Sequence, residues 1–145
     1  MSLDEKTFYE LFELVPRLTV DAIILNDKRV LLVKRDIEPE INKWHFPGGF
    51  VHLNEKLESA VRRKALEETG LYVEVLDLFK VYEYLRGEEL YDPRGHVVSL
   101  TYLCKPLKGK LRKNARFFSY SETPDEMGFG QRKYVEDLYE VGLIV

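Results

Sequence analysis

The spacing of apolar residues predicts a short amphipathic helix at the start of the chain. Phe8, Leu11, Phe12 and Val15 recur at helical intervals, and Pro16 is expected to end the helix. We therefore predict a helix within residues 1–15. Its apolar face is expected to pack on the rest of the domain or on a second copy of the chain, and an aromatic clamp for a ligand is the alternative.

A second helix is predicted near the middle of the chain, over residues 55–69. Asn54 is the expected N-cap, apolar residues recur every fourth position from Leu57 to Ala65, and Gly70 follows the last helical residue. A similar pattern predicts a terminal helix over residues 131–140.

Apolar, β-branched and aromatic runs predict the strands, which span residues 18–25, 30–33, 71–85, 97–104 and 117–118. The first two are expected to form a hairpin around the turn signal Asn26-Asp27. Helices mixed among strands that are mostly linked as hairpins indicate an α/β protein with a central mixed sheet and helices on its faces.

Four polar or glycine-containing segments predict loops or turns. Residues 36–46 show no period, the glycines of Pro47-Gly48-Gly49 predict a tight exposed turn, and residues 106–110 and 121–130 are expected to be a turn and a loop.

Composition narrows the class of protein. A chain of 145 residues with 45% apolar residues suits one domain, so residues 1–145 are expected to form a single core. The net charge of −3 gives no basic excess for nucleic-acid binding, and no apolar run approaches the roughly 20 residues that span a bilayer. The lone Cys104 allows no internal disulfide and favours a reducing, cytoplasmic compartment.

Candidate chemistry lies on the middle helix. Glu67 and Glu68 form an acidic edge, and Arg63 lies one turn earlier, where it can orient Glu55 or Glu67. Carboxylates are the hard oxygen ligands that Mg²⁺ or Mn²⁺ prefers, and such ions can also bridge to phosphate oxygens. A pair of glutamates alone more often marks a solvated helix face, so the surrounding sequence decides its interpretation.

The surrounding sequence reads GFVHLNEKLESAVRRKALEETGL over residues 49–71. It resembles the Nudix box, Gly-x5-Glu-x7-Arg-Glu-U-x-Glu-Glu-x-Gly-U, where U is a bulky aliphatic residue. The residues in register are Gly49, Glu55, Arg63, Glu67, Glu68, Gly70 and Leu71, with Ala65 as a small occupant of an aliphatic position. The flanking segments WHFPGG, VLLVKR and FFSYSETPDEMGF are also similar to Nudix proteins, so the resemblance covers most of the chain from Leu18 onward.

The resemblance implies a Nudix-type α/β/α sandwich and metal-dependent hydrolysis of a nucleoside diphosphate linked to another group. It implies Glu67 and Glu68 as metal ligands for Mg²⁺ or Mn²⁺, the Gly48 carbonyl as a backbone ligand, and Arg63 with Glu55 as the orienting pair.

One position departs from this pattern. Lys64 replaces the glutamate where family members often place the general base or another metal ligand. An ammonium repels Mg²⁺ and accepts no proton from water at its ordinary pKa. Three explanations compete: another residue supplies the base, Lys64 acts as a fixed cation on the phosphates, or hydrolysis is weak and the domain mainly binds its ligand.

A substitute base is sought in the loop over residues 121–130, because Nudix enzymes commonly bring an acidic or histidine side chain over the metals from this region. Glu126 is our first candidate, ahead of Glu122 and Asp125. His52, inside the box, is a weaker one.

The segment YDPRGHVV resembles one found in ADP-ribose pyrophosphatases and in Nudix-domain regulators of NAD metabolism. The resemblance makes ADP-ribose, cleaved to AMP and ribose 5-phosphate, the best substrate prediction. Arg94 would bind a phosphate or carboxylate, and Asp92 would bind the ribose hydroxyls. Tyr82, Tyr84 or Phe129 would stack on a base, with Arg35 as a further substrate-binding residue. A plain β-turn is the alternative for the Asp92–Gly95 segment.

Two other functions stay open. A GDP-mannose type of hydrolase also lacks the usual box glutamate and would release a sugar. A catalytically weakened domain would instead bind or sense a nucleotide. The resemblance also implies a possible homodimer, for which the first helix offers an apolar face.

Overall fold

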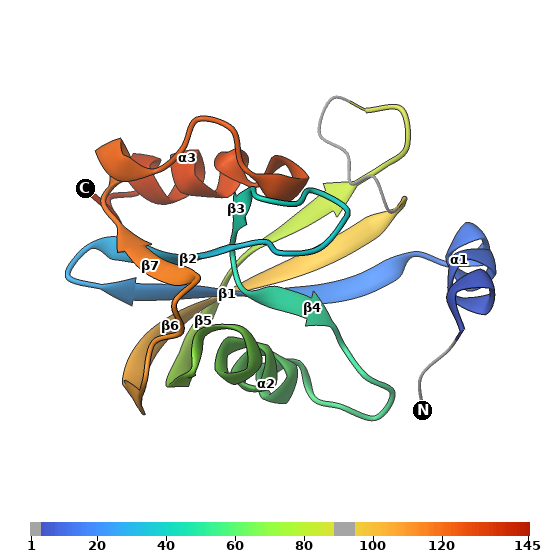
Figure 1. Cartoon of the computed structure of the whole chain (residues 1–145), viewed down its shortest axis with the longest axis horizontal. Helices are drawn as coiled ribbons and strands as arrows, with labels where there is room; N and C mark the ends of the chain where they lie inside the picture. Colours follow the sequence, from blue (N-terminus) through green and yellow to red (C-terminus); the bar gives the residue numbers. More distant parts are fainter. Residues whose placement is uncertain (1–3, 89–94) are drawn as a thin grey trace.

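The computed structural model describes residues 4–88 and 95–145 (Figure 1). The helices are α1 (Glu5–Leu14), α2 (Leu57–Thr69) and α3 (Arg132–Glu140), with 3-10 turns η1 (Tyr120–Glu122) and η2 (Gly128–Gly130). The strands are β1 (Arg17–Asn26), β2 (Arg29–Lys34), β3 (Trp44–His45), β4 (Gly48–Phe50), β5 (Leu71–Tyr84), β6 (Val97–Gly109) and β7 (Ala115–Phe118).

Strand β1 is the centre of a mixed sheet. It pairs in parallel with β6, from Arg17 opposite Val97 to Ile24 opposite Cys104, and in antiparallel fashion with β4 and β2. Strand β5 continues the sheet beyond β6, while β3 and β7 pair with β2. The predicted mixed sheet is confirmed.

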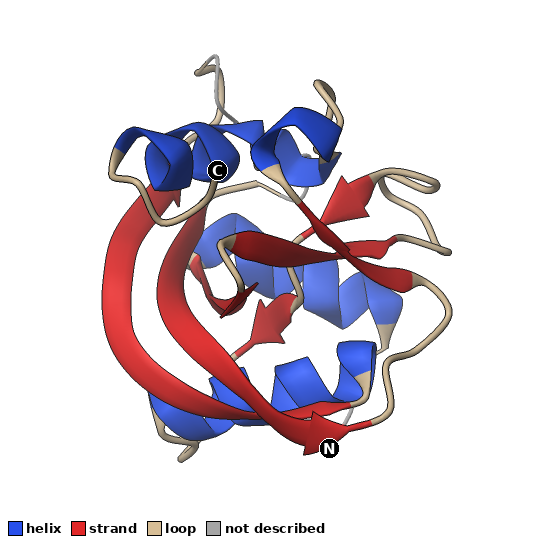
Figure 2. Ribbon diagram, turned by 90° about the vertical axis from the view of Figure 1, so that its left-hand side faces the viewer, coloured by secondary structure: helices blue, strands red, loops and turns tan. Residues whose placement is uncertain are grey.

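Helices cover both faces of this sheet: α3 lies above it and α2 below it in Figure 1, and Figure 2 shows the same layers from the side. Strands alternate their side chains between the faces. Ala22 and Ile24 therefore join the core between the sheet and α2, whereas Ile23 between them joins the core between the sheet and α3. The predicted α/β/α sandwich is confirmed.

Helix α1 packs on the domain at the start of β1. The rings of Phe8 and Phe12 contact Phe50 of β4, with centroids 5.5 and 5.3 Å apart. They also enclose the guanidinium of Arg17, which lies 5.0 and 4.7 Å from their centroids and is almost fully buried. The aromatic residues thus serve packing in this structure, while Leu14 on the same helix stays exposed.

The structure corrects the predicted start of the middle helix. Helix α2 begins at Leu57, after Lys56 as N-cap, and Asn54 adopts a left-handed backbone with a φ of 63°. The reason is that Glu55 is held outside the helix by side-chain bonds described below. The predicted end is confirmed, since Gly70 caps the helix with a φ of 83°.

The predicted turn at the glycine pair is wrong. Gly48 and Gly49 lie in strand β4 and pair with Asp21 and Val20 of β1. The glycines are needed for close approach: a Cβ at Gly48 would lie 2.1 Å from Asp21 Oδ1 and 2.4 Å from the Val20 carbonyl oxygen. The predicted turn at residues 106–110 is also wrong, because β6 continues to Gly109 through pairs with the first residues of β5.

Within the part of the chain that the structure describes, no helix combines the length and apolar character needed to cross a membrane.

Candidate active site

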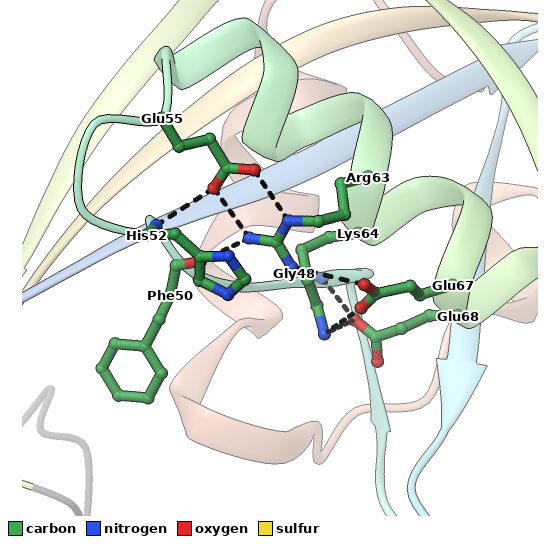
Figure 3. A network of polar contacts seen from close by, with 8 residues as sticks. All are labelled: Gly48, Phe50, His52, Glu55, Arg63, Lys64, Glu67 and Glu68. Carbon is green, nitrogen blue, oxygen red and sulfur yellow. Dashed lines mark hydrogen bonds and ion pairs between the residues drawn. The ribbon is translucent and has the colours of Figure 1, made fainter. Parts of the chain in front are cut away.

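A forked ion pair ties the loop before α2 to the helix (Figure 3). Arg63 donates from Nε to Glu55 Oε2 at 2.8 Å and from Nη2 to Glu55 Oε1 at 2.9 Å. Nη2 also donates to the Phe50 carbonyl at 2.8 Å, and the His52 backbone N–H donates to Glu55 at 3.0 Å. These bonds, above all those from Arg63, lower the pKa of Glu55 to about 2.

The fork fixes a loop that contains little regular structure of its own. Charge-assisted, bidentate bonds are among the stronger polar contacts in proteins, and both partners here are mostly shielded, with side chains 24% and 15% exposed. Arg63 therefore joins three points of the box, namely β4, the loop and α2. Arg63 and Glu55, which the sequence predicts as an orienting pair, are thus bonded to each other in the structure.

One turn further along α2, two carboxylates face the glycine strand (Figure 3). Glu68 accepts a hydrogen bond from the Gly48 N–H at 2.7 Å, and its side chain is 22% exposed. Burial raises the pKa of Glu68. Glu67 is half-exposed; burial raises its pKa, but hydrogen bonds and charge from Lys64 and Arg63 outweigh that effect and lower it.

Lys64 lies between these carboxylates. Its Nζ is 3.1 Å from Glu67 Oε2 and 3.9 Å from Glu68 Oε1, and its side chain is only 21% exposed. The stem of the lysine runs along Gly49, where an added Cβ would lie 2.7 Å from Lys64 Cε. The missing side chain at Gly49 gives the lysine its place.

The donor set suits a divalent cation that is completed by phosphate. Among residues 4–88 and 95–145, no three His, Cys, Asp or Glu side chains converge as a ready metal site. Mg²⁺ is, however, commonly bound by one or two carboxylates together with substrate phosphates and waters. Glu67 and Glu68, with the Gly48 backbone beside them, provide that smaller set. The residues present therefore fit such an ion.

An open cleft, here called the outer cleft, has these carboxylates on its wall. It is lined by Val33, Lys34, Arg35, Asp36, Ile37, His45, Glu67, Glu68, Arg112 and Asn114. Acidic and basic side chains thus face the same space, which is the arrangement expected for a metal-assisted phosphate site.

A second cleft, the inner cleft, lies between the sheet and the segment before α3. Its walls are formed by Thr19, Asp21, Arg35, His45, Phe46, Gly48, Gly49, Tyr84, Val97, Ser99, Phe129, Gln131 and Tyr134. Arg35 and His45 border both clefts, so the two are neighbours.

A buried polar network forms the floor of the inner cleft. Asp21 accepts hydrogen bonds from the Ser99 hydroxyl and, at 3.4 Å, from the Tyr134 hydroxyl. Tyr84 donates in turn to the Tyr134 hydroxyl. Burial, followed by the charge of Asp21, raises the pKa of Tyr134 well above its ordinary value. Tyr134 therefore stays protonated and acts as a donor near neutral pH.

Of the predicted substrate-binding residues, three lie at the inner cleft, but they differ in how accessible they are. Arg35 and Phe129 lie together at the inner cleft, with the guanidinium 5.0 Å from the ring centroid. Tyr84 lines the same cleft but is 2% exposed, so its ring offers little surface for stacking. Asp92 and Arg94 lie outside the described residues.

Glu126 is not brought to the box carboxylates. Its side chain is 81% exposed and pairs with Lys43 Nζ at 2.9 Å, and it lines neither cleft. Lys43 also pairs with Glu40 at 2.8 Å. His52 is an exposed loop residue that contributes its backbone N–H to Glu55.

Sequence reasoning missed the network around Asp21. A signal was present, because Asp21 is a single charged residue inside the apolar run LTVDAII. Buried carboxylates are rare unless they are paired, so such a residue often belongs to a polar site. Its partners Ser99 and Tyr134 are far away in sequence, and only strand pairing and helix packing bring them to it.

Known proteins agree with this geometry. The NUDIX domain model matches residues 15–138. An ADP-ribose pyrophosphatase of Methanocaldococcus jannaschii is 37% identical over 134 residues, which are 89% of this chain and 76% of that protein. A MutT-like protein of Streptomyces ambofaciens is 35% identical over 73% of this chain and 62% of its own length.

Solved structures give the same result. A MutT NUDIX hydrolase from Burkholderia pseudomallei superposes with a TM-score of 0.73 at 29% identity, over 84% of this chain and 97% of that one. The NUDIX domain of Shewanella oneidensis NrtR, solved as a complex with ADP ribose, superposes with a TM-score of 0.68 at 25% identity, over 97% of this chain and 94% of that one. The forked pair, the two carboxylates and these matches together place the chain in the Nudix family, as a hydrolase that acts on pyrophosphate bonds.

Proposed function

We propose that this chain hydrolyses the pyrophosphate of ADP-ribose to AMP and ribose 5-phosphate, with Mg²⁺ or Mn²⁺ as the cofactor. The observation that carries the proposal is the position of Glu67 and Glu68 on the wall of a cleft that also holds basic residues. Support for the substrate comes from the ADP-ribose pyrophosphatase that is 37% identical and from the ADP-ribose complex of a similar domain.

In this proposal Glu67, Glu68 and the Gly48 carbonyl hold the metal. The bound ion would neutralise the pyrophosphate charge and orient the attacked phosphorus. Gly48 also donates its N–H to Glu68 at 2.7 Å, so this residue would orient one metal ligand with its N–H and supply another with its carbonyl. The backbone of β4 is rigid here because it pairs with β1 and has no room for a side chain at Gly48.

Arg63 and Glu55 act as positioning residues. Their fork sets the distance between β4 and α2, and thereby the distance between Gly48 and the two glutamates. Partners of this kind matter because metal sites depend on ligand geometry.

The nucleoside is assigned to the inner cleft. Arg35 and Phe129 supply a cation and an aromatic ring at its border, while Asp21, Ser99 and Tyr134 supply a fixed polar floor. Asp92 and Arg94 stay candidates for the ribose and a phosphate through their sequence context.

The test is turnover of ADP-ribose, GDP-mannose and a small nucleotide panel with Mg²⁺ or Mn²⁺, with products separated by chromatography. AMP and ribose 5-phosphate are expected from ADP-ribose. Release of a free sugar from GDP-mannose as the faster reaction would replace the substrate assignment.

The same assay on Lys64→Glu addresses the departure from the box. Activity in the natural protein shows an enzyme that works with lysine at this position. Activity only in Lys64→Glu would instead indicate a nucleotide-binding domain, which Lys64 between the two carboxylates would explain.

A further inference from the structure

Lys64 does not line the outer cleft itself, but it contacts two of the acidic side chains that do, Glu67 and Glu68. Three basic side chains, Lys34, Arg35 and Arg112, line this cleft, and so do three acidic ones, Asp36, Glu67 and Glu68. These charges balance. When the charge of Lys64 beside Glu67 and Glu68 is added, the whole set is net positive, whereas a glutamate at the same place would make it net negative.

The ammonium of Lys64 lies where a positive charge is favourable both in the empty cleft and in a cleft that holds a pyrophosphate. At 3.1 and 3.9 Å from Glu67 and Glu68, it already compensates both carboxylates. Two carboxylates that approach each other without a cation would repel, and burial of Glu68 would make that repulsion more costly.

The lysine is also enclosed by its surroundings. Its stem fills the space beside Gly49, and its side chain is 21% exposed, whereas that of Arg62 on the same helix is 50% exposed. A cation that is ordered before the ligand arrives loses little entropy when the ligand binds.

We propose that Lys64 is a built-in cation of the pyrophosphate site, which takes over part of the charge that a divalent ion supplies. This inference rests on the proposed function as far as the outer cleft binds a pyrophosphate. Two consequences follow. The free protein binds divalent cations weakly, and it binds pyrophosphate even when no metal is present.

The first consequence is tested with Mn²⁺ alone, by electron paramagnetic resonance of the free ion. Lys64→Glu is expected to bind Mn²⁺ at least tenfold more tightly than the natural protein, with Lys64→Met between them. Arg62→Glu changes the net charge of the chain by the same amount and is the matched control, which should bind like the natural protein. Equal Mn²⁺ binding by Lys64→Glu and the natural protein would overturn the proposal.

The second consequence is tested with inorganic pyrophosphate in the presence of EDTA, by titration calorimetry. The natural protein is expected to bind, and Lys64→Met to bind at least tenfold more weakly, while Arg62→Met binds normally. Absence of binding by the natural protein, or unchanged binding by Lys64→Met, would overturn the proposal. Circular dichroism and melting of each variant separate a folding defect from a charge effect.

Neither measurement contains a nucleotide. A chain that fails them but hydrolyses ADP-ribose contradicts the role of Lys64 and leaves the proposed function in place. A chain that gives the expected binding results but does not hydrolyse ADP-ribose supports the role of Lys64 and contradicts the proposed function.

Discussion

Two clusters of charge are centred on neighbouring residues of helix α2, Arg63 and Lys64, and they are built differently. At Arg63 and Glu55 the bonds are short, at 2.8 and 2.9 Å, and Arg63 reaches the other cluster only through a longer bond to Glu67, at 3.4 Å. At Lys64, Glu67 and Glu68 the distances between charged atoms are 3.1 and 3.9 Å, and Glu67 is half-exposed.

This difference distinguishes residues that position the site from residues that can bind a ligand. In the fork, Glu55 and the Phe50 carbonyl already take the short hydrogen bonds of Arg63, so these residues are suited to positioning their surroundings. A loose cluster beside an open cleft can exchange its partners for a cation or a phosphate at small cost. If this distinction is correct, changes in the fork affect both stability and turnover, whereas changes in the cluster affect turnover alone.

The largest expected effect is that of Glu68→Gln on turnover. The amide keeps an oxygen for the Gly48 N–H but lacks the negative charge of a metal ligand, so we expect kcat/KM to fall by more than about 100-fold. Because burial raises the pKa of Glu68, removing its charge should leave the melting temperature unchanged or higher. Steady-state kinetics and calorimetry measure both quantities.

Glu58→Gln is the control for that variant, because Glu58 lies on the same helix and pairs with Arg62 away from both clefts. Its turnover should match that of the natural protein. Equal activity of Glu68→Gln and Glu58→Gln would remove Glu68 from the site.

A smaller effect on rate, joined by an effect on stability, is expected for Glu55→Gln. It weakens two bonds from Arg63 and leaves a partly shielded guanidinium without its carboxylate. Lost charged hydrogen bonds of this kind cost about 1–3 kcal/mol, and lost support for metal ligands costs about 10- to 100-fold in activity. Urea unfolding and kinetics test this. A rate loss without any stability loss would place Glu55 in the chemistry instead.

The contribution of the fork should also depend on pH. The pKa of Glu55 falls from an ordinary value of 4.5 to about 2 in the folded protein, so its ionised form stabilises the fold. That contribution is present above pH 4.5 and is lost as the pH falls towards 2. The difference in unfolding free energy between the natural protein and Glu55→Gln should therefore be largest at pH 7 and shrink steadily as the pH falls from 4.5 towards 2. A constant difference across this range would argue against the fork.

The smallest effect is expected for Glu126→Gln. The carboxylate of Glu126 is exposed and pairs with Lys43 outside both clefts, so we expect turnover to stay within about threefold of the natural value, as for most exposed side chains. A large fall in kcat with unchanged KM would identify Glu126 as the general base after all and would show that its loop moves over the carboxylates.

The three helices, the longer strands and the fork could be predicted from the sequence. Helical spacing and the box predicted α2 up to Gly70, and the pairing of Arg63 with Glu55 came from the same motif. These features depend on residues that are close together in the sequence, so local spacing is enough to predict them.

The remaining features depend on contacts that no spacing encodes. Gly48 lies in a strand because β1 passes within contact distance, and Asp21 becomes part of a cleft because Ser99 and Tyr134 reach it from β6 and α3. The start of α2 moved for a similar reason, since Glu55 binds Arg63 instead of joining the helix.

The parallel pairing of β1 with β6 has a consequence for how the chain folds. Residues 17–24 can complete their hydrogen bonds only after residues 97–104 have been made. Until then β1, with its fully buried Val20, Ile23 and Ile24, is an unprotected apolar strand edge. Such distant pairings slow folding, and exposed edges of this kind favour aggregation. The central strand of the sheet is thus an early segment that has to wait for its neighbour during synthesis.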